Sequence, residues 1–181
     1  MNLPFETETD VERAICADVS WQTGAFWGLP RSGHPEGTVA AHVAMVLANV
    51  DKNAVSPEDR ARLRLCAIIH DSFKYKVDKT KPKEGPNHHG HIAARFAEKY
   101  TQDKGLVLVI ETHDDAYNAW KQIERGREWN AVKRAGALIL RLGDEIPFYL
   151  RFYRSDNGVP GKTREPVEWF ERFLKARGFA T

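Results

Sequence analysis

The residues with the clearest chemical potential are the adjacent pair His70-Asp71, which follows the strongly apolar stretch 63–69. Neighbouring side chains on a helix point about 100° apart. These two can therefore contact a common partner only if it lies beside the last helical turn. There an imidazole nitrogen and a carboxylate oxygen can hold one cation between them. The pair alone also fits a buried histidine beside a surface aspartate, and on its own it favours that simpler arrangement.

Two further residues shift this balance towards a metal site. His42 interrupts an apolar helix face between Val39 and Val46, although a lone histidine there is more often a core residue with one good partner. Asp144 follows the apolar segment 138–142, and a buried carboxylate is costly without a cation or several donors. Two histidines and two carboxylates suit Mn²⁺, Fe²⁺, Co²⁺, Ni²⁺ or Zn²⁺, and Mg²⁺ is also compatible. The predicted ligands are His42, His70, Asp71 and Asp144.

A second ion is an open alternative. His89 and His113 each lie at the edge of an apolar helical segment, where either also fits a surface position. With Asp71 as a bridging carboxylate, they can hold an ion about 3.5–4 Å from the first, as in two-metal hydrolytic sites. Helical geometry lets one, or at most two, of His88, His89 and His91 face such a site.

These residues must be positioned by helices, because the chain shows helical apolar periodicity almost throughout. The segment 106–113 is Val-rich enough for a strand, but no second strand candidate exists to pair with it. Predicted helices cover 10–19, 37–50, 57–70, 88–100, 106–113, 117–124, 131–153 and 166–174, and predicted loops cover 21–35, 74–87 and 155–162. The expected class is all-α, a single-domain multi-helix bundle.

Length and composition support one globular domain over residues 1–181. The chain is 42% hydrophobic and carries a net charge of only +2, which argues against a polynucleotide partner. Two cysteines give no disulfide framework, so we expect a reducing, cytoplasmic setting. We expect no signal peptide and no membrane partner, because no apolar run approaches the roughly 18–20 residues of a transmembrane helix. The oligomeric state stays open, with a homodimer among the alternatives.

The order of these residues resembles the HD superfamily of metal-dependent phosphohydrolases. Residues 70–74, His-Asp-Ser-Phe-Lys, look like the family's His-Asp-x-x-Lys form. Residues 33–42 are similar to the start of the HD module of bacterial CCA-adding enzymes, and residues 89–94 match the family's third histidine and its small neighbours. The resemblance covers a core of about residues 33–150, with an N-terminal and a C-terminal helix packed on it.

The resemblance implies a helical HD-type fold, one or two divalent metals, and hydrolysis of a small phosphorylated metabolite, with a nucleotide foremost. Asp71 would orient the water, and Lys74 would neutralise a phosphoryl oxygen, unless it is simply a solvated loop lysine. The loop residues Arg31, His34 and Glu36 either line the entrance as substrate-binding residues or only cap the next helix. Trp120 is one of several tryptophans that fit either a stacking platform for a base or ordinary helix packing.

Two other functions remain open. The same six-ligand set resembles that of di-iron oxygenases within the superfamily. A metal ion can also be purely structural, in a non-catalytic signalling or binding module. The sequence lacks the Gly-rich turn and paired aspartates of the CCA-adding head and the Gly-Tyr-Pro element of cyclic-di-GMP phosphodiesterases, so neither of those substrates carries over.

Overall fold

The structure, a computed structural model, describes residues 2–30 and 37–180, and every regular element within them is helical. The predicted all-α class is therefore confirmed. The helices are α1 (Asp10–Ala17), α2 (Val19–Ala25), α3 (Val39–Asn53), α4 (Pro57–Ile69), α5 (His89–Ala97), α6 (Lys104–Thr112), α7 (Asp115–Glu124), α8 (Glu128–Leu142), α9 (Ile146–Asn157) and α10 (Glu165–Lys175), with 3₁₀ turns η1 (Lys74–Lys76), η2 (Gly85–Asn87) and η3 (Gly143–Glu145). No helix in this part of the chain is long and apolar enough to cross a membrane.

Helix starts follow from capping side chains that are visible in the sequence. The Thr9 hydroxyl accepts a hydrogen bond from the backbone N–H of Glu12 at the start of α1. The Ser56 hydroxyl does the same for Asp59 at the start of α4, where Pro57 occupies the first turn. These caps satisfy N–H groups that a helix leaves without partners, so both predicted starts are confirmed.

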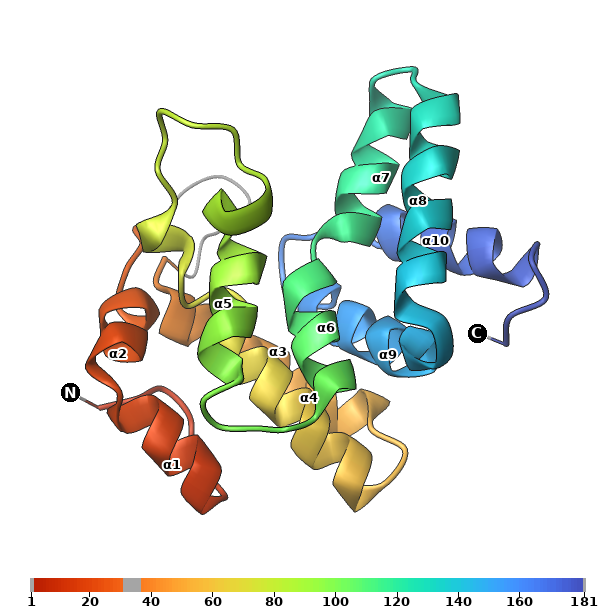
Figure 1. Ribbon diagram of the computed structural model, residues 1–181. Coiled ribbons are helices and arrows are strands. Elements are labelled where there is room, and N and C mark those ends of the chain that lie inside the picture. Colours follow the sequence, from red (N-terminus) through yellow and green to blue (C-terminus); the bar gives the residue numbers. More distant parts are fainter. Residues whose placement is uncertain (1, 31–36, 181) are drawn as a thin grey trace.

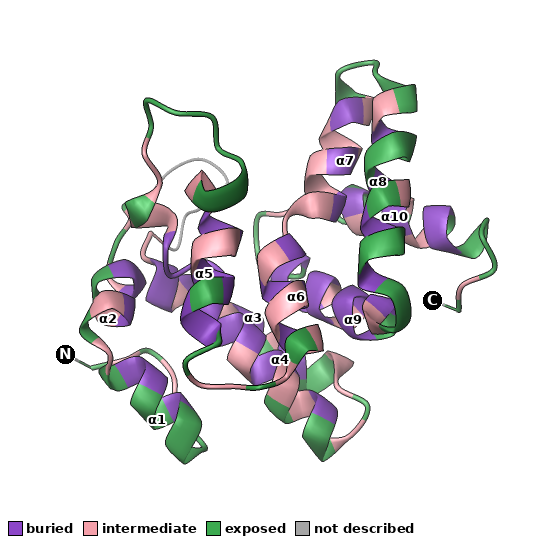
Figure 2. Cartoon of the chain, in the orientation of Figure 1, coloured by how far each residue is buried: buried purple, intermediate pink, exposed green. Residues whose placement is uncertain are grey.

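The helices share one hydrophobic core. Helices α3, α4 and α9 pack on one another, α5 packs against α6, and the α7–α8 pair lies above α9 in the view of Figure 1. Figure 2 shows the buried residues concentrated on the faces that meet between helices. Full burial of one large apolar side chain contributes roughly 1.5–3 kcal/mol. Helices from both ends of the chain contribute side chains to this core. Examples are Ile15, Val43, Ile68, Val109, Phe152 and Phe170.

The predicted loop over 21–35 is wrong in its first part, which forms α2, and the predicted first helix ends before Val19. Asp18 separates the two helices, because its side chain accepts hydrogen bonds from the N–H groups of Ser20 and Trp21. The buried Trp21 indole donates to the carbonyl of Ile68, with an N–O distance of 2.8 Å. Helix α2 therefore supports the end of α4, where the His-Asp pair begins.

The predicted continuous helix over 131–153 is also wrong. Gly143 adopts a left-handed conformation (φ +51°) that other residues rarely adopt, and it ends α8. Pro147 lies in the first turn of α9 and starts a new helix, where the sequence predicted only a bend. Helix α9 consequently packs back against α3 and α4, and it extends to Asn157. This change of direction decides which aspartate reaches the histidines.

Candidate metal centre

The His-Asp pair sits where α4 ends. His70 is the C-cap residue of α4, and Asp71 follows in a tight turn; both are buried. His70 Nδ1 lies 3.0 Å from the carbonyl oxygen of Ala67. Because a carbonyl only accepts, Nδ1 carries a proton, and Nε2 is the ring nitrogen directed at the centre. Phe152 lies edge-on to the His70 ring at 5.3 Å and helps to fix its orientation.

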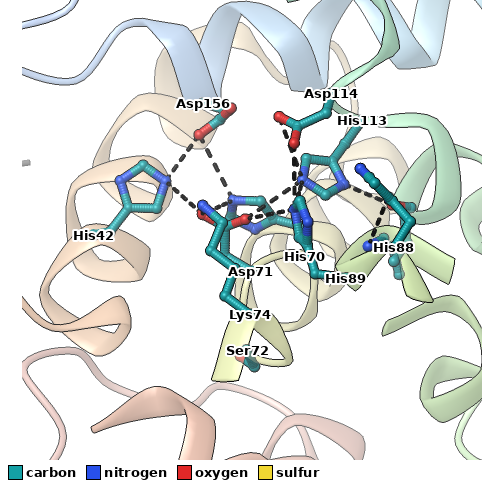
Figure 3. A network of polar contacts seen from close by, with 12 residues as sticks. His42, His70, Asp71, Ser72, Lys74, His88, His89, His113, Asp114 and Asp156 are labelled. Atoms are coloured by element: carbon teal, nitrogen blue, oxygen red, sulfur yellow. Dashed lines mark hydrogen bonds and ion pairs between the residues drawn. The ribbon is translucent and has the colours of Figure 1, made fainter. Parts of the chain in front are cut away.

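Four ligand atoms converge on one side of Asp71 in a group that we call site A. Its members are His42 Nε2, His70 Nε2, Asp71 Oδ2 and Asp156 Oδ1 (Figure 3). Asp156 Oδ1 lies 2.8 Å from His42 Nε2 and 3.6 Å from His70 Nε2. Asp71 Oδ2 lies 3.8 Å from His42 Nε2 and 3.5 Å from His70 Nε2. Helices α3, α4 and α9 thus each contribute at least one candidate ligand to site A.

Four more atoms converge on the other side of Asp71, in a group that we call site B. Its members are His89 Nε2, His113 Nε2, Asp71 Oδ1 and Asp114 (Figure 3). Asp71 Oδ1 lies 3.4 Å from the Nε2 atom of each histidine. His89 Nε2 lies 3.3 Å from Asp114 Oδ2 and 3.1 Å from His113 Nε2. His113 Nδ1 donates to the carbonyl of Ile110 at 2.7 Å, so its Nε2 also points inward.

Both groups fit a divalent ion. With metal–ligand bonds of about 2.0–2.2 Å, the ligand atoms of a tetrahedral site lie roughly 3.3–3.6 Å apart, close to most of these distances. His70 Nε2 and Asp71 Oδ1 are buried and have no hydrogen-bond partner within the described part of the chain, although buried polar atoms are rarely left unsatisfied. A cation on each side of Asp71 would satisfy both atoms. The buried cluster can therefore hold a metal ion, and Asp71 directs one oxygen to each site.

The charges of the carboxylates are balanced by nearby cations. Lys74 Nζ lies 2.5 Å from Asp71 Oδ2, and Lys162 Nζ lies 3.1 Å from Asp156 Oδ1. Burial opposes ionisation of Asp71, but Lys74 and His70 hold its pKa well below the usual range. Burial likewise opposes ionisation of Asp156, and Lys162 and His42 hold its pKa well below the usual range. Both ligand carboxylates are therefore ionised at neutral pH.

We expect binding of Zn²⁺ at site B to release a proton and to weaken as the pH falls below about 9. Burial opposes the charged form of His113, but the carboxylates of Asp114 and Asp71 raise its pKa to about 9. A metal ligand must be neutral, so the apparent affinity falls about tenfold for each pH unit below that pKa. Calorimetric titration in buffers of different ionisation enthalpy measures the released protons. The His113→Ala variant retains site A and should release fewer; equal release from both proteins would contradict the assignment.

The structure brings together six of the residues that the sequence singled out. These are His42, His70, Asp71, Lys74, His89 and His113. Among the three neighbouring histidines, His89 faces the centre, whereas His91 pairs with Glu111 at 2.9 Å. The ring of His88 lies 4.5 Å from that of His89, and its Nδ1 caps α5 by accepting from the N–H of Gly90.

The predicted ligand Asp144 is wrong. Its side chain is exposed in η3, the turn that follows where Gly143 ends α8. Asp156 on α9 takes its place in site A. The residues predicted to bind substrate, Arg31, His34 and Glu36, lie outside the described residues.

Sequence reasoning missed two carboxylates whose signals were present. Asp114 directly follows His113, so the chain contains a second His-Asp pair like the first. Phe148, Phe152 and Asp156 follow one another at intervals of four residues, so their side chains share one face of a helix. That face of α9 is buried. Assigning residues 155–162 to a loop hid this periodicity.

Two cavities meet the centre. The first, of about 510 Å³, has Asp71, Asp114 and Asp156 in its wall, together with Lys74 and Lys162. The second, of about 530 Å³, lies against His42, Asp71 and Lys74 and has a more apolar lining that includes Phe26 and Trp27. The three carboxylates and His42 thus border open cavities, whereas a closed structural site uses all its positions for protein ligands.

Comparison with protein-family models finds no match for this chain, and comparisons with curated proteins and with solved structures find no similar protein either.

Proposed function

We propose that this protein is an HD-type metal-dependent phosphohydrolase that cleaves a phosphoester of a small phosphorylated molecule, a nucleotide foremost. The observation that carries the proposal is Asp71, which directs its two oxygens to two histidine pairs in the wall of an open cavity. The order of the ligands along the chain supports the HD assignment, since one His-Asp pair supplies the central carboxylate.

The openness of the site favours catalysis over a structural role. Structural metal sites use all their ligand positions for protein atoms, whereas catalytic sites leave positions for water and substrate. Three of the candidate ligands, Asp71, Asp114 and Asp156, line the cavity of about 510 Å³. This volume is within the range of pockets for small metabolites, about 300–1,000 Å³.

The side chains around the ligands suit an anionic substrate. Divalent ions bound here would supply Lewis acidity and a bound water of lowered pKa. Hydrolysis adds the oxygen of water to phosphorus, breaks the phosphorus bond to the leaving oxygen, and passes a water proton to the leaving group. Burial opposes the charged form of Lys74, but Asp71 and Asp114 raise its pKa above the usual value, so Lys74 keeps its ammonium charge. It can therefore donate a hydrogen bond to a non-bridging phosphoryl oxygen while the negative charge there develops.

We expect phosphate release from nucleoside monophosphates or p-nitrophenyl phosphates with at least one of Mn²⁺, Co²⁺, Fe²⁺, Ni²⁺, Zn²⁺ or Mg²⁺, and loss of that activity with EDTA. The His89→Ala variant should lose more than about 100-fold in kcat/KM, because even the outer partners of metal ligands are worth roughly 10–100-fold. His91→Ala is the matched control: it removes a histidine of the same helix that pairs with Glu111, and it should stay within about twofold of wild type.

Two outcomes contradict the proposal. Tightly bound iron with substrate-dependent oxygen consumption and no phosphate release would establish the oxygenase alternative. Metal-dependent folding without turnover of any of these esters would establish a structural ion in a non-catalytic module.

A further inference from the structure

The cavity of about 510 Å³ contains a polar group that the metal centre does not use. Tyr153 lies on α9, three residues before Asp156, so the two side chains share a face. The residue is only 2% exposed and lines the cavity, and its hydroxyl has no hydrogen-bond partner among residues 2–30 and 37–180. A buried hydroxyl without a partner costs about 1–3 kcal/mol, which a ligand oxygen would recover. This hydroxyl therefore indicates a polar ligand beside site A.

Lys162 lines the same cavity and contacts a ligand atom of site A. Its ammonium group lies 3.1 Å from both the carbonyl oxygen and Oδ1 of Asp156. That Oδ1 atom is also the one directed at His42 and His70. An ion in site A would bind this oxygen and repel the positive charge of Lys162. The Lys162 side chain is about a quarter exposed and has the open cavity beside it. Metal binding would thus weaken the contact of Lys162 with Oδ1 and leave its ammonium group available to an anion in the cavity.

The lining of the cavity also contains two aromatic side chains of α7. Tyr117 and Trp120 lie on one side of α7, with ring centroids 5.8 Å apart and planes inclined by 30°. Helix α7 begins directly after Asp114, and at 1.5 Å per residue Trp120 lies roughly 9 Å further along its axis. The aromatic wall is therefore about one small-molecule length from site B. Planar rings stack on such side chains with little dependence on the identity of the ring.

We propose that this cavity takes a phosphomonoester whose leaving group carries a planar ring, with Lys162 and the Tyr153 hydroxyl binding the phosphate and Trp120 stacking on the ring. The inference rests on the proposed function and specifies its substrate. Two ammonium groups, Lys74 and Lys162, match the double charge of a terminal phosphate better than the single charge of a diester. Lys162 and Tyr153 lie beyond the region that resembles the HD family, in α9 and the loop that follows it.

The test combines equilibrium binding with kinetics on the metal-loaded protein. Inorganic phosphate, titrated by calorimetry, should bind the Lys162→Met and Tyr153→Phe variants at least about tenfold more weakly than wild type, as charge-assisted hydrogen bonds are lost. Lys175→Met and Tyr100→Phe are matched controls. Lys175 is exposed on α10, and the Tyr100 hydroxyl donates to Asp18 far from the cavity, so both variants should bind phosphate like wild type.

The ring platform is tested by comparing adenosine 5′-monophosphate with ribose 5-phosphate, which lacks the ring. Trp120→Ala should raise KM about tenfold or more for the first and leave it unchanged for the second. Bis(p-nitrophenyl) phosphate should be the poorest substrate. Unchanged phosphate binding in both Lys162→Met and Tyr153→Phe, or equal effects of Trp120→Ala on the two monoesters, would overturn the inference.

Failure of the proposed function looks different. In that case no ester is hydrolysed with any ion, while phosphate binding still reports on Lys162 and Tyr153. Weakened phosphate binding in their variants would then support the anion site without the reaction, and absence of phosphate binding to wild type would overturn it.

Discussion

Replacing Asp71 by Asn should weaken the binding of both proposed ions and lower kcat/KM by more than about 100-fold. Its two carboxylate oxygens face different histidine pairs, at 3.5 Å from His70 and at 3.4 Å from both His89 and His113. Asparagine keeps the size of the side chain but removes its negative charge and one of its two oxygen ligands. Metal content after dialysis, measured by elemental analysis, and kinetics on the same preparation provide the two readouts.

Single-site variants show whether Asp71 really is shared. Asp156→Asn should weaken only the ion of site A, because Asp156 approaches His42 and His70 alone among the four histidines. Asp114→Asn should weaken only the ion of site B, since Asp114 approaches His89 and His113. Asp144→Asn is the matched control and should change neither metal content nor activity, because that side chain is exposed in η3. Unchanged content of both ions in Asp71→Asn would rule out the shared carboxylate.

Local sequence signals were enough to predict the helices that carry the histidines. Thr9, Ser56 and Pro57 fix helix starts through interactions within one turn, and the apolar periodicity around His42 depends only on the helix that contains it. His70, His89 and His113 each lie at a helix end, where their backbone positions follow from the same local rules. The positions of these ligands along the chain could therefore be predicted.

The fourth ligand of site A could not be found in this way. Asp144 and Asp156 both follow apolar helical segments, and the choice between them depends on Gly143 ending α8. A glycine inside a helical pattern is often tolerated, so the sequence alone did not indicate that the chain turns there. The direction of α9 is set by its packing against α3 and α4, which is a tertiary effect.

The structure of α2 was missed for a related reason. Gly24 passes so close to the backbone of Ser72 that a Cβ atom would lie 1.5 Å from its carbonyl oxygen. A glycine and several polar residues resemble a loop in the sequence, but here the glycine permits close contact between two elements. The same contact supports the turn that contains Asp71.

Adding a divalent ion to protein treated with EDTA should raise the melting temperature by about 8–16 °C for each occupied site. An ion at about 1,000 times its dissociation constant adds roughly 4 kcal/mol to the free energy of unfolding. In a domain of this size, each kcal/mol raises the melting temperature by roughly 2–4 °C. The buried atoms His70 Nε2 and Asp71 Oδ1 have no hydrogen-bond partner among the residues that the structure describes. A bound cation would satisfy both atoms and so stabilise the folded protein.

The increments identify how many ions bind. His42→Ala removes a ligand of site A alone and His113→Ala removes one of site B alone, so each variant should retain about half of the wild-type increase. Retention of the full increase in one variant and loss of all of it in the other would leave a single ion, at the site where the substitution abolished the response. Metal stabilisation should also weaken between about pH 9 and pH 7 in the wild type and in His42→Ala, because His113, with its pKa of about 9, must lose a proton to bind an ion. His113→Ala, in which only site A remains, should lack that part of the pH dependence. This difference would assign each increment to its own histidine pair, and it would separate two distinct ions from one ion that all four histidines share.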